Sequence, residues 1–286
     1  MSITTSAVLV ELNISVWTAN KLDKSETEKV IVGNSAVKDA AQVRKNLMAG
    51  TSMRKEIADY TAGCRLWHNT RTLPWADKGA RLLPTSLFMD YKQEVNVRRD
   101  TYNRMVDNFI ANYPNLVQTA QNYLGGLFNA DDYPSVEEVQ SKFGFRLVFS
   151  PVPESNDFRL AVAEQDLQDL RQQYESNFNA RLADAMREPW DRLHKLLTGM
   201  SEKLTDKAGE EDQKKTRYHD TLITNATALC SLLTHLNVSN DPKLEQARRQ
   251  LEQTMVGADI DSIKESAEVR ASMKTKVDAI LSQFQW

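Results

Sequence analysis

Apolar side chains recur every three or four residues over most of this chain, and this period predicts amphipathic helices. The most regular stripe runs from Leu167 to Leu204 without a break in step. It predicts one helix over about 163–207, on the order of 65 Å long at a rise of about 1.5 Å per residue. Because few globular cores are that wide, part of this helix is expected to project as a coiled-coil arm or to lie along a partner.

The second half of this stripe is the part expected to meet other helices, and we call it the helical interaction stripe. Pro189 lies inside it and removes one backbone hydrogen bond, so a kink or a break is expected near Arg187. The charged segment 209–215 predicts a turn, and 218–236 predicts an antiparallel helix that completes a helical hairpin. The residues of the helical interaction stripe are Leu182, Met186, Trp190, Leu193, Leu197, Met200 and Leu204.

Two further helices are predicted towards the end of the chain. Asp241–Pro242 is a strong helix start, because the Asp side chain caps free amides and Pro fits the first helical position. Gly257 is expected to end this helix, and Asp259 or Asp261 to cap the final one.

Strand patterns occur only twice, and together they predict a small two-stranded β element. Residues 6–17 place β-branched side chains in rough alternation, and residues 143–152 alternate apolar with polar side chains. Ser135 followed by Glu138 resembles a capping box, which opens a short helix before the second strand.

The region between these strands has weaker patterns. The polar residues 18–28 predict a loop, and residues 35–60 have a weak helical period that Gly50 divides into two helices. A strong apolar period over about 86–112 predicts a helix that ends at Pro114.

The chain is therefore predicted to be mainly α, with long amphipathic helices that form a helical bundle or a coiled-coil hairpin beside the β element. Ten Gly and eight Pro are few for 286 residues, which agrees with long helices. The length allows one large domain or two small ones. Residues 1–160 are expected to form a mixed α/β body, and 161–286 a helical hairpin or bundle with a long arm.

The cysteines and the N-terminus bear on the compartment. Cys64 and Cys230 lie far apart and outside any CxxC pattern, so a reducing compartment is expected. Residues 1–13 lack the features of a signal peptide, and no apolar run approaches the roughly 20 residues that span a bilayer. The sequence thus predicts a cytoplasmic protein with no membrane partner.

No sequence motif points to catalysis, a metal or a cofactor, so the chain is expected not to be an enzyme. The four histidines are too scattered for the H-E-x-x-H spacing of zinc ligands. Neither GxxxxGK[ST] nor GxGxxG is present to hold a phosphate, and Gly-x-Ser-x-Gly is absent. Acidic pairs such as Asp131–Asp132 are better explained as solvated charge than as a shared site.

Residues 64–84 break the helical period and predict a long ordered loop, the basic aromatic loop, in which cations alternate with two tryptophans. Residues 44–104 carry twelve Lys and Arg against six Asp and Glu, a net +6 in a chain of net charge −3. Cations beside aromatic rings can follow a phosphate backbone while bases stack on the rings. The rings can instead pin the loop to the core, which is the favoured interpretation, or contact a partner protein. The candidate residues for nucleic-acid or partner binding are Arg65, Trp67, Arg71, Trp75, Lys78, Arg81, Arg98 and Arg99.

Three segments resemble an uncharacterised protein family of bacteria and phages. They are LNISVWTANKL at 12–22, GARLLP at 79–84 and YPSVEEVQSKFGFRLVFSPVP at 133–153, so the resemblance spans roughly the first two thirds of the chain. Members of that family are often encoded beside a MoxR-type AAA+ ATPase and a cobaltochelatase-like protein. The resemblance therefore implies an accessory or adaptor role, in the host cytoplasm if the chain is phage-encoded.

These observations lead to three hypotheses about function. The first is a non-enzymatic interaction protein that associates with itself or with a MoxR-type AAA+ ATPase through its helical arm. The second is nucleic-acid binding through the basic aromatic loop and its neighbours over 65–104, with an affinity that falls steeply with salt. The third is inhibition of a host enzyme.

Overall fold

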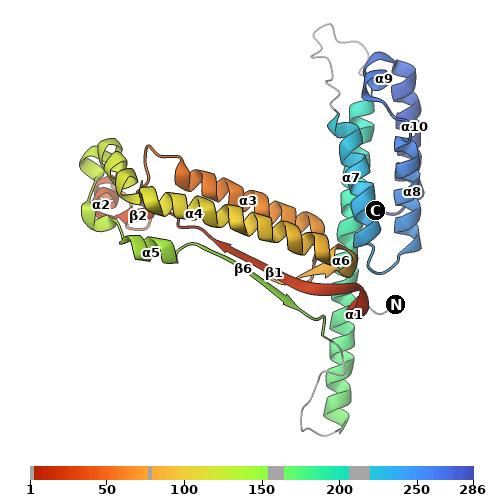
Figure 1. The fold of residues 1–286 in the computed structure, drawn as a ribbon, viewed down its shortest axis with the longest axis horizontal. Coiled ribbons are helices and arrows are strands. Elements are labelled where there is room, and N and C mark those ends of the chain that lie inside the picture. The colour runs from red at the N-terminus through yellow and green to blue at the C-terminus, as the bar shows by residue number, and fades with distance from the viewer. Residues whose placement is uncertain (1–2, 77–78, 154–163, 206–219) are drawn as a thin grey trace. The chain divides into compact units, whose positions relative to one another are not determined.

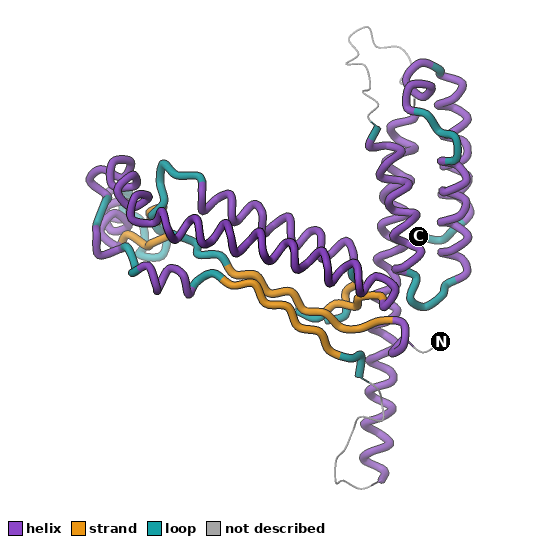
Figure 2. The backbone as a smooth tube through the Cα atoms, viewed as in Figure 1, coloured by secondary structure: helices purple, strands orange, loops and turns teal. Residues whose placement is uncertain are grey.

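The computed structural model describes residues 3–76, 79–153, 164–205 and 220–286. It confirms a mainly helical chain with a small sheet (Figures 1 and 2). The contacts group the chain into two compact units. Unit 1 comprises Met1–Glu11, Asn69–Met89 and Phe149–Trp286, and unit 2 comprises Leu12–His68 and Asp90–Val148. This grouping differs from the division near residue 160 that the sequence suggested.

The sheet contains both predicted strands and two more. The predicted segments form β1 (Ala7–Ser15) and β6 (Gly144–Ser150), which are neighbours in the order β4-β5-β1-β6. The added strands, β4 (Leu73–Pro74) and β5 (Arg81–Pro84), come from the basic aromatic loop, so the expectation of only two strands is wrong. β5 is antiparallel to β1. Its apolar stretch LLP is short and directly follows the cationic segment, so the sequence pattern did not indicate a strand.

The core of unit 1 is built on the long helix α6 (Glu164–Leu204). It packs with α7 (Thr221–Leu236), α8 (Pro242–Met255) and α10 (Ala267–Gln283), which Figure 1 shows beside the second half of α6. The short helices α1 (Ile3–Ser6) and α9 (Ile260–Glu265) and the 3-10 turn η1 (Thr85–Leu87) complete the unit.

A kink or a break was expected near Arg187, and the structure shows no break, because α6 continues through Pro189. Proline costs a backbone hydrogen bond inside a helix. Burial on both sides offsets that loss, because Ala185 and Leu193 are both fully buried. The start predicted near residue 163 and the charged turn predicted over 209–215 lie outside the described residues.

Capping side chains set the later helix boundaries. The Asp241 carboxylate accepts a hydrogen bond of 2.9 Å from the backbone N–H of Lys243 and starts α8 as predicted. The single final helix predicted from the sequence is instead two helices. Asp259 caps α9, and Ser266 starts α10 by accepting a hydrogen bond from the N–H of Val269.

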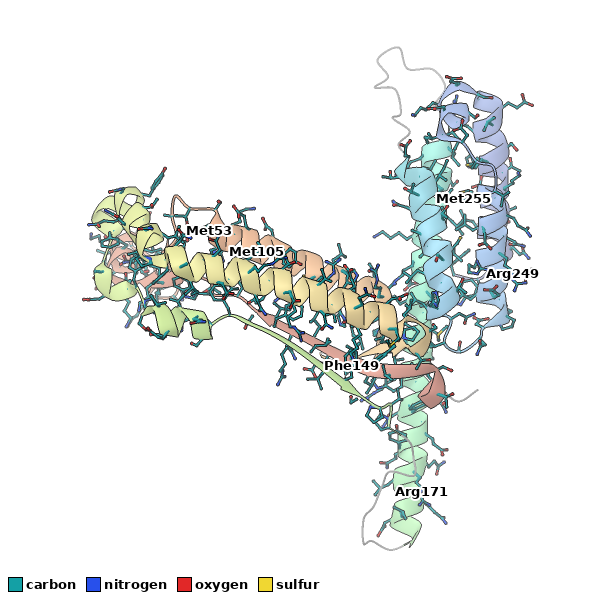
Figure 3. All side chains as sticks on the ribbon, viewed as in Figure 1. Met53, Met105, Phe149, Arg171, Arg249 and Met255 are labelled. Carbon is teal, nitrogen blue, oxygen red and sulfur yellow. The ribbon has the colours of Figure 1, made fainter. Side chains whose placement is uncertain are left out.

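Unit 2 is dominated by two long helices. α3 spans Met53–Arg71, and α4 spans Phe88–Leu124 and passes through Pro114, where the sequence predicted an end. The buried residues of α4 continue beyond the proline, so packing holds the helix together. Met53 and Met105 pack against the core of this unit (Figure 3).

The first half of the basic aromatic loop is helical, which corrects the loop predicted from Cys64 onward. Cys64 and His68 extend a buried row of α3 that begins at Ile57 and Thr61, at steps of three and four residues. The tryptophan at position 67 fits this helix, although the Trp and Pro residues that follow made the whole segment look irregular.

The smaller elements of unit 2 differ most from the predictions. The polar segment at 18–28 contains β2 (Asn20–Asp23) and the start of α2 (Lys24–Gly33), and β3 (Val43–Asn46) replaces the first helix expected over 35–60. β2 and β3 form an antiparallel pair. Gly50 has a positive φ of 76° and lies before α3, but it does not divide two helices, because β3 replaces the first of them. The turns η2 (Gly125–Leu127) and η3 (Ala130–Asp132) lead to α5 (Val136–Ser141), which Ser135 caps as predicted.

Candidate interaction site

The residues of the basic aromatic loop do not form one surface within a unit. Unit 2 holds Arg65, Trp67, Arg98 and Arg99, and unit 1 holds Arg71, Trp75 and Arg81. Lys78 lies outside the described residues. The cations and rings that are neighbours along the chain are therefore divided between two cores.

Trp67 is enclosed by other side chains in unit 2. It is 7% exposed and stacks on Tyr91, with ring centroids 4.7 Å apart. The Cζ atom of Arg98 lies 4.7 Å from the centroid of the Trp67 ring, and Arg98 also pairs with Glu94 at 2.8 Å. The indole is therefore a packing element rather than an exposed stacking platform.

A buried histidine and tyrosine lie beside this stack. His68 Nδ1 and the Tyr91 hydroxyl are 2.7 Å apart, and both side chains are at most 5% exposed. Burial raises the pKa of Tyr91, so the phenol stays neutral at physiological pH. Both side chains therefore lie within the packing of unit 2.

Trp75 and Arg81 also contact other side chains, within unit 1. Trp75 is 8% exposed and meets Phe178 edge-on, with centroids 5.2 Å apart. Arg81 donates through Nε to the Thr72 hydroxyl at 2.7 Å and lies 3.6 Å from Glu188. The favoured interpretation of the sequence, that the rings pin this segment, agrees with these contacts.

Arg192 of α6 binds the C-terminal end of α3, where carbonyl groups lack helical partners. Its guanidinium donates to the carbonyl of Thr70 at 2.5 Å and to that of Asn69 at 2.7 Å, and it also pairs with Glu188. Arg192 was not among the predicted site residues. Its role depends on a contact between residues more than 100 positions apart, which no local pattern reveals.

Nucleic-acid binding by this region stays a prediction, and it would now depend on charged side chains alone. Of those in unit 2, Arg65 donates to the carbonyl of Ile14 at 2.6 Å, whereas Arg99 is exposed. Bases would find no free indole face at Trp67 or Trp75, so the stacking part of the hypothesis has no exposed ring to use.

The helical interaction stripe lies mostly inside unit 1. Leu193, Leu197, Met200 and Leu204 are at most 2% exposed and belong to the core that α6 forms with α7, α8 and α10. The stripe residues Leu182 and Met186 are partly buried against the neighbouring cluster around Trp75. Trp190 donates through Nε1 to Asp241 at 3.1 Å and contacts Phe284 and Trp286. Helices of the same chain therefore cover the stripe.

The clearest exposed apolar surface lies in unit 2, on α2 and the elements that meet it. The sequence Val30-Ile31-Val32 ends α2, yet that helix has no buried residue. Val32 is 71% exposed and Val37, just beyond the helix, 77%. Figure 1 shows α2, β2 and the end of α4 gathered at one end of this unit. We call the exposed large side chains there the apolar tip: Leu22, Val30, Val32, Val37, Tyr123 and Leu127.

A buried lysine holds the elements of the apolar tip together. Lys45 of β3 is 8% exposed, and its Nζ lies 3.2 Å from Asp23, 2.5 Å from Asp132 and 3.1 Å from the carbonyl of Leu127. The backbone N–H of Glu26 is the main cause that lowers the pKa of Asp23 to about 2, and Lys45 adds to it. The hydrogen bond that Lys45 donates to Asp132 is the main cause that raises the pKa of Lys45. One ammonium group thus joins β2, β3 and the η2–η3 turns.

The sequence contained one signal of the apolar tip, which the prediction missed. The apolar run Val30-Ile31-Val32 follows the polar residues 24–29. Together they fit neither the pattern of a buried strand nor that of an amphipathic helix. Three consecutive apolar residues on a helix point in three directions, so a single core cannot cover them all.

The described residues show little that suits catalysis. Among them, no group of three or more His, Cys, Asp or Glu side chains could hold a metal ion. Cys64 and Cys230 are both buried, and burial raises the pKa of the Cys230 thiol to about 11. That thiol is therefore protonated at neutral pH and a poor nucleophile.

Comparison of the chain with protein-family models, with curated proteins and with solved structures found no match. The resemblance to a bacterial and phage family therefore stays a prediction. Within the described ranges, none of the helices has the length and apolar character needed to cross a bilayer.

Proposed function

We propose that this chain is a non-enzymatic interaction protein that binds a protein partner through the apolar tip. The observation that carries the proposal is α2, a helix whose sequence includes three consecutive large apolar residues and which buries none of its side chains. Exposed apolar patches on a folded surface mark protein contacts more often than chance. These apolar side chains are not part of a buried cluster, so their contribution to the stability of the fold is small.

The surroundings of the apolar tip favour binding because they hold it in one shape. Lys45 ties β3 to Asp23 and Asp132, and the ring of Tyr123 lies against Gly50. A Cβ atom at position 50 would lie 2.3 Å from that ring, and the positive φ there also favours glycine. A surface that is already ordered loses less conformational entropy when a partner binds.

Two partners follow from the sequence: a second copy of this chain and a MoxR-type AAA+ ATPase, the latter implied by the family resemblance. The proposed surface differs from the helical arm first expected, because the helical interaction stripe is covered within unit 1. The part of α6 before Leu182, where Arg171 lies (Figure 3), is a segment of the expected arm that does not belong to this covered core.

The test introduces charge into the apolar tip. Val32→Asp with Val37→Asp should abolish the interaction, because burying two carboxylates in an apolar interface is unfavourable. Val256→Asp is the matched control, since Val256 in unit 1 is also 77% exposed. Light scattering at micromolar concentration measures self-association, and co-purification with a MoxR-type ATPase measures the second partner.

The proposal fails under either of two results. One is a wild-type chain that is monomeric and retains no ATPase. The other is an interaction that survives the double substitution in the apolar tip while circular dichroism shows the variant to be folded.

A further inference from the structure

A groove between α6 and α7 in unit 1 has the features of a small-molecule site. Its volume is about 480 Å³, within the range of roughly 300–1,000 Å³ typical of ligand pockets. It belongs to unit 1, whereas the apolar tip belongs to unit 2, and the proposed function does not use it. The residues that line it are Thr70, Arg192, Lys195, Leu196, Gly199, Met200, Lys203, Thr221, Leu222, Asn225, Leu229 and Leu232.

The lining combines an apolar floor with a cationic rim. Leucine and methionine side chains from both helices form most of the floor. Lys195 and Lys203 are exposed, and neither forms an ion pair within the described part of the chain. Arg192 also lines the groove, but its charge is already paired with Glu188 and it is bound to carbonyls at the end of α3. Among the described residues that line the groove there is no carboxylate, so their charge is complementary to an anion.

A glycine near the C-terminal end of α6, Gly199, leaves space in the groove. Gly199 lies four residues after Lys195 and four before Lys203, which places all three on one face of the helix. A helix is less stable with glycine than with alanine at an interior position. A Cβ atom added at Gly199 would meet nothing within 4 Å, so no packing in this chain requires the glycine. What its missing side chain provides is free space between the two lysines.

We propose that this groove binds a single-chain anionic amphiphile, with its acyl chain on the floor and its acid group at Lys195 and Lys203. An apolar tail matches the leucines, and an anionic head matches the two unpaired ammonium groups. Affinity for a series of alkyl carboxylates should rise with chain length, by roughly fourfold for each added CH₂ that the floor covers.

The experiment titrates the full chain with octanoate, decanoate and laurate below their micelle concentrations, using calorimetry. Saturable one-to-one binding that tightens with chain length is expected. Alkyltrimethylammonium ions of equal length should bind at least roughly tenfold more weakly, because the rim repels cations. Absence of saturable carboxylate binding overturns the proposal, and so does equal affinity for the cationic series.

Two substitutions locate the site. Gly199→Leu fills the groove and should weaken laurate binding at least roughly tenfold without unfolding the helix. The matched control is Gly63→Leu in α3, because a Cβ there also meets nothing within 4 Å. Unchanged binding by Gly199→Leu, or equal loss in Gly63→Leu, would refute the assignment.

A further arm distinguishes the source of the amphiphile. Cosedimentation with phosphatidylglycerol vesicles that Gly199→Leu abolishes would identify a lipid as the ligand. Laurate binding without vesicle binding would identify a free fatty acid. Lys195→Gln with Lys203→Gln should reduce the affinity for laurate roughly tenfold and remove most of its salt dependence. Wild-type affinity in this double variant would show that the rim does not bind the head group.

Discussion

Replacing Lys45 by methionine tests whether this buried ammonium group holds unit 2 together. The substitution keeps the length of the side chain and removes its charge. It leaves Asp23 and Asp132 close together, with side chains only 10% and 12% exposed, and it also leaves the Leu127 carbonyl without its donor. Removing one partner of a buried ion pair costs about 3–5 kcal/mol, and the remaining access of water lowers this to about 2–4 kcal/mol for Lys45→Met.

Urea denaturation followed by far-UV circular dichroism measures this loss, and hydrogen exchange of the β2 and β3 amides assigns it to unit 2. Lys55→Met is the matched control, because Lys55 is 72% exposed and pairs only with Asp59 on the same helix surface. It should change the free energy of unfolding by less than about 0.5 kcal/mol.

A second variant separates lost charge balance from lost packing. Adding Asp23→Asn and Asp132→Asn to Lys45→Met removes the uncompensated carboxylates, and Asn can still cap α2. More than half of the lost stability should return. If Lys45→Met is as mild as Lys55→Met, or if the triple variant is less stable than the single one, the electrostatic argument for the apolar tip is wrong.

Three further predictions concern unit 1 and the thiols. The hydrogen bond from Arg248 holds the pKa of Glu245 at about 2, below its usual 4.5, so this pair stabilises the fold above pH 4.5 and loses its effect as the pH falls towards 2. Glu245→Gln should therefore be less stable at pH 7 and show a flatter loss of stability on acid titration. Leu197 is fully buried, and Leu197→Ala should lower the free energy of unfolding by about 2–5 kcal/mol in urea denaturation. Neither Cys64 nor Cys230 should react with a thiol reagent before the chain unfolds, whereas rapid labelling of the native protein would contradict their burial.

The sequence predicted those parts of the fold in which a local hydrophobic period or a capping residue is strong enough to be recognised by itself. In α6 the apolar step of three and four residues persists through Pro189, so the helix was recognised although its continuity was not. β6 was recognised because apolar and polar residues alternate over part of it and because Pro151 and Pro153 follow it, although Leu147, Val148 and Phe149 are consecutive apolar residues. Capping residues such as Ser135 and Asp241 act on amides two or three residues away, so their effect is visible in the sequence.

The parts that the sequence did not predict depend on contacts between distant residues. β2 and β3 are only four residues each, and their paired residues are 20 to 26 positions apart, so neither strand carries enough alternation to be recognised alone. The cations of the basic aromatic loop looked free because their acceptors are backbone carbonyls or distant carboxylates. A local sequence pattern shows the hydrogen-bond donors. It does not show which acceptors the fold places beside them.

The apolar tip and the α6–α7 groove should respond to salt in opposite ways, and this separates the two proposals. Six apolar side chains supply the contact at the tip, so its binding should persist or strengthen with added salt and show a negative heat-capacity change. The groove relies on Lys195 and Lys203, which are exposed, so screening should weaken its hold on the head group. The acyl chain would keep part of the affinity. An interaction with a protein partner that falls steeply with salt would therefore point away from the apolar tip and towards a cationic surface.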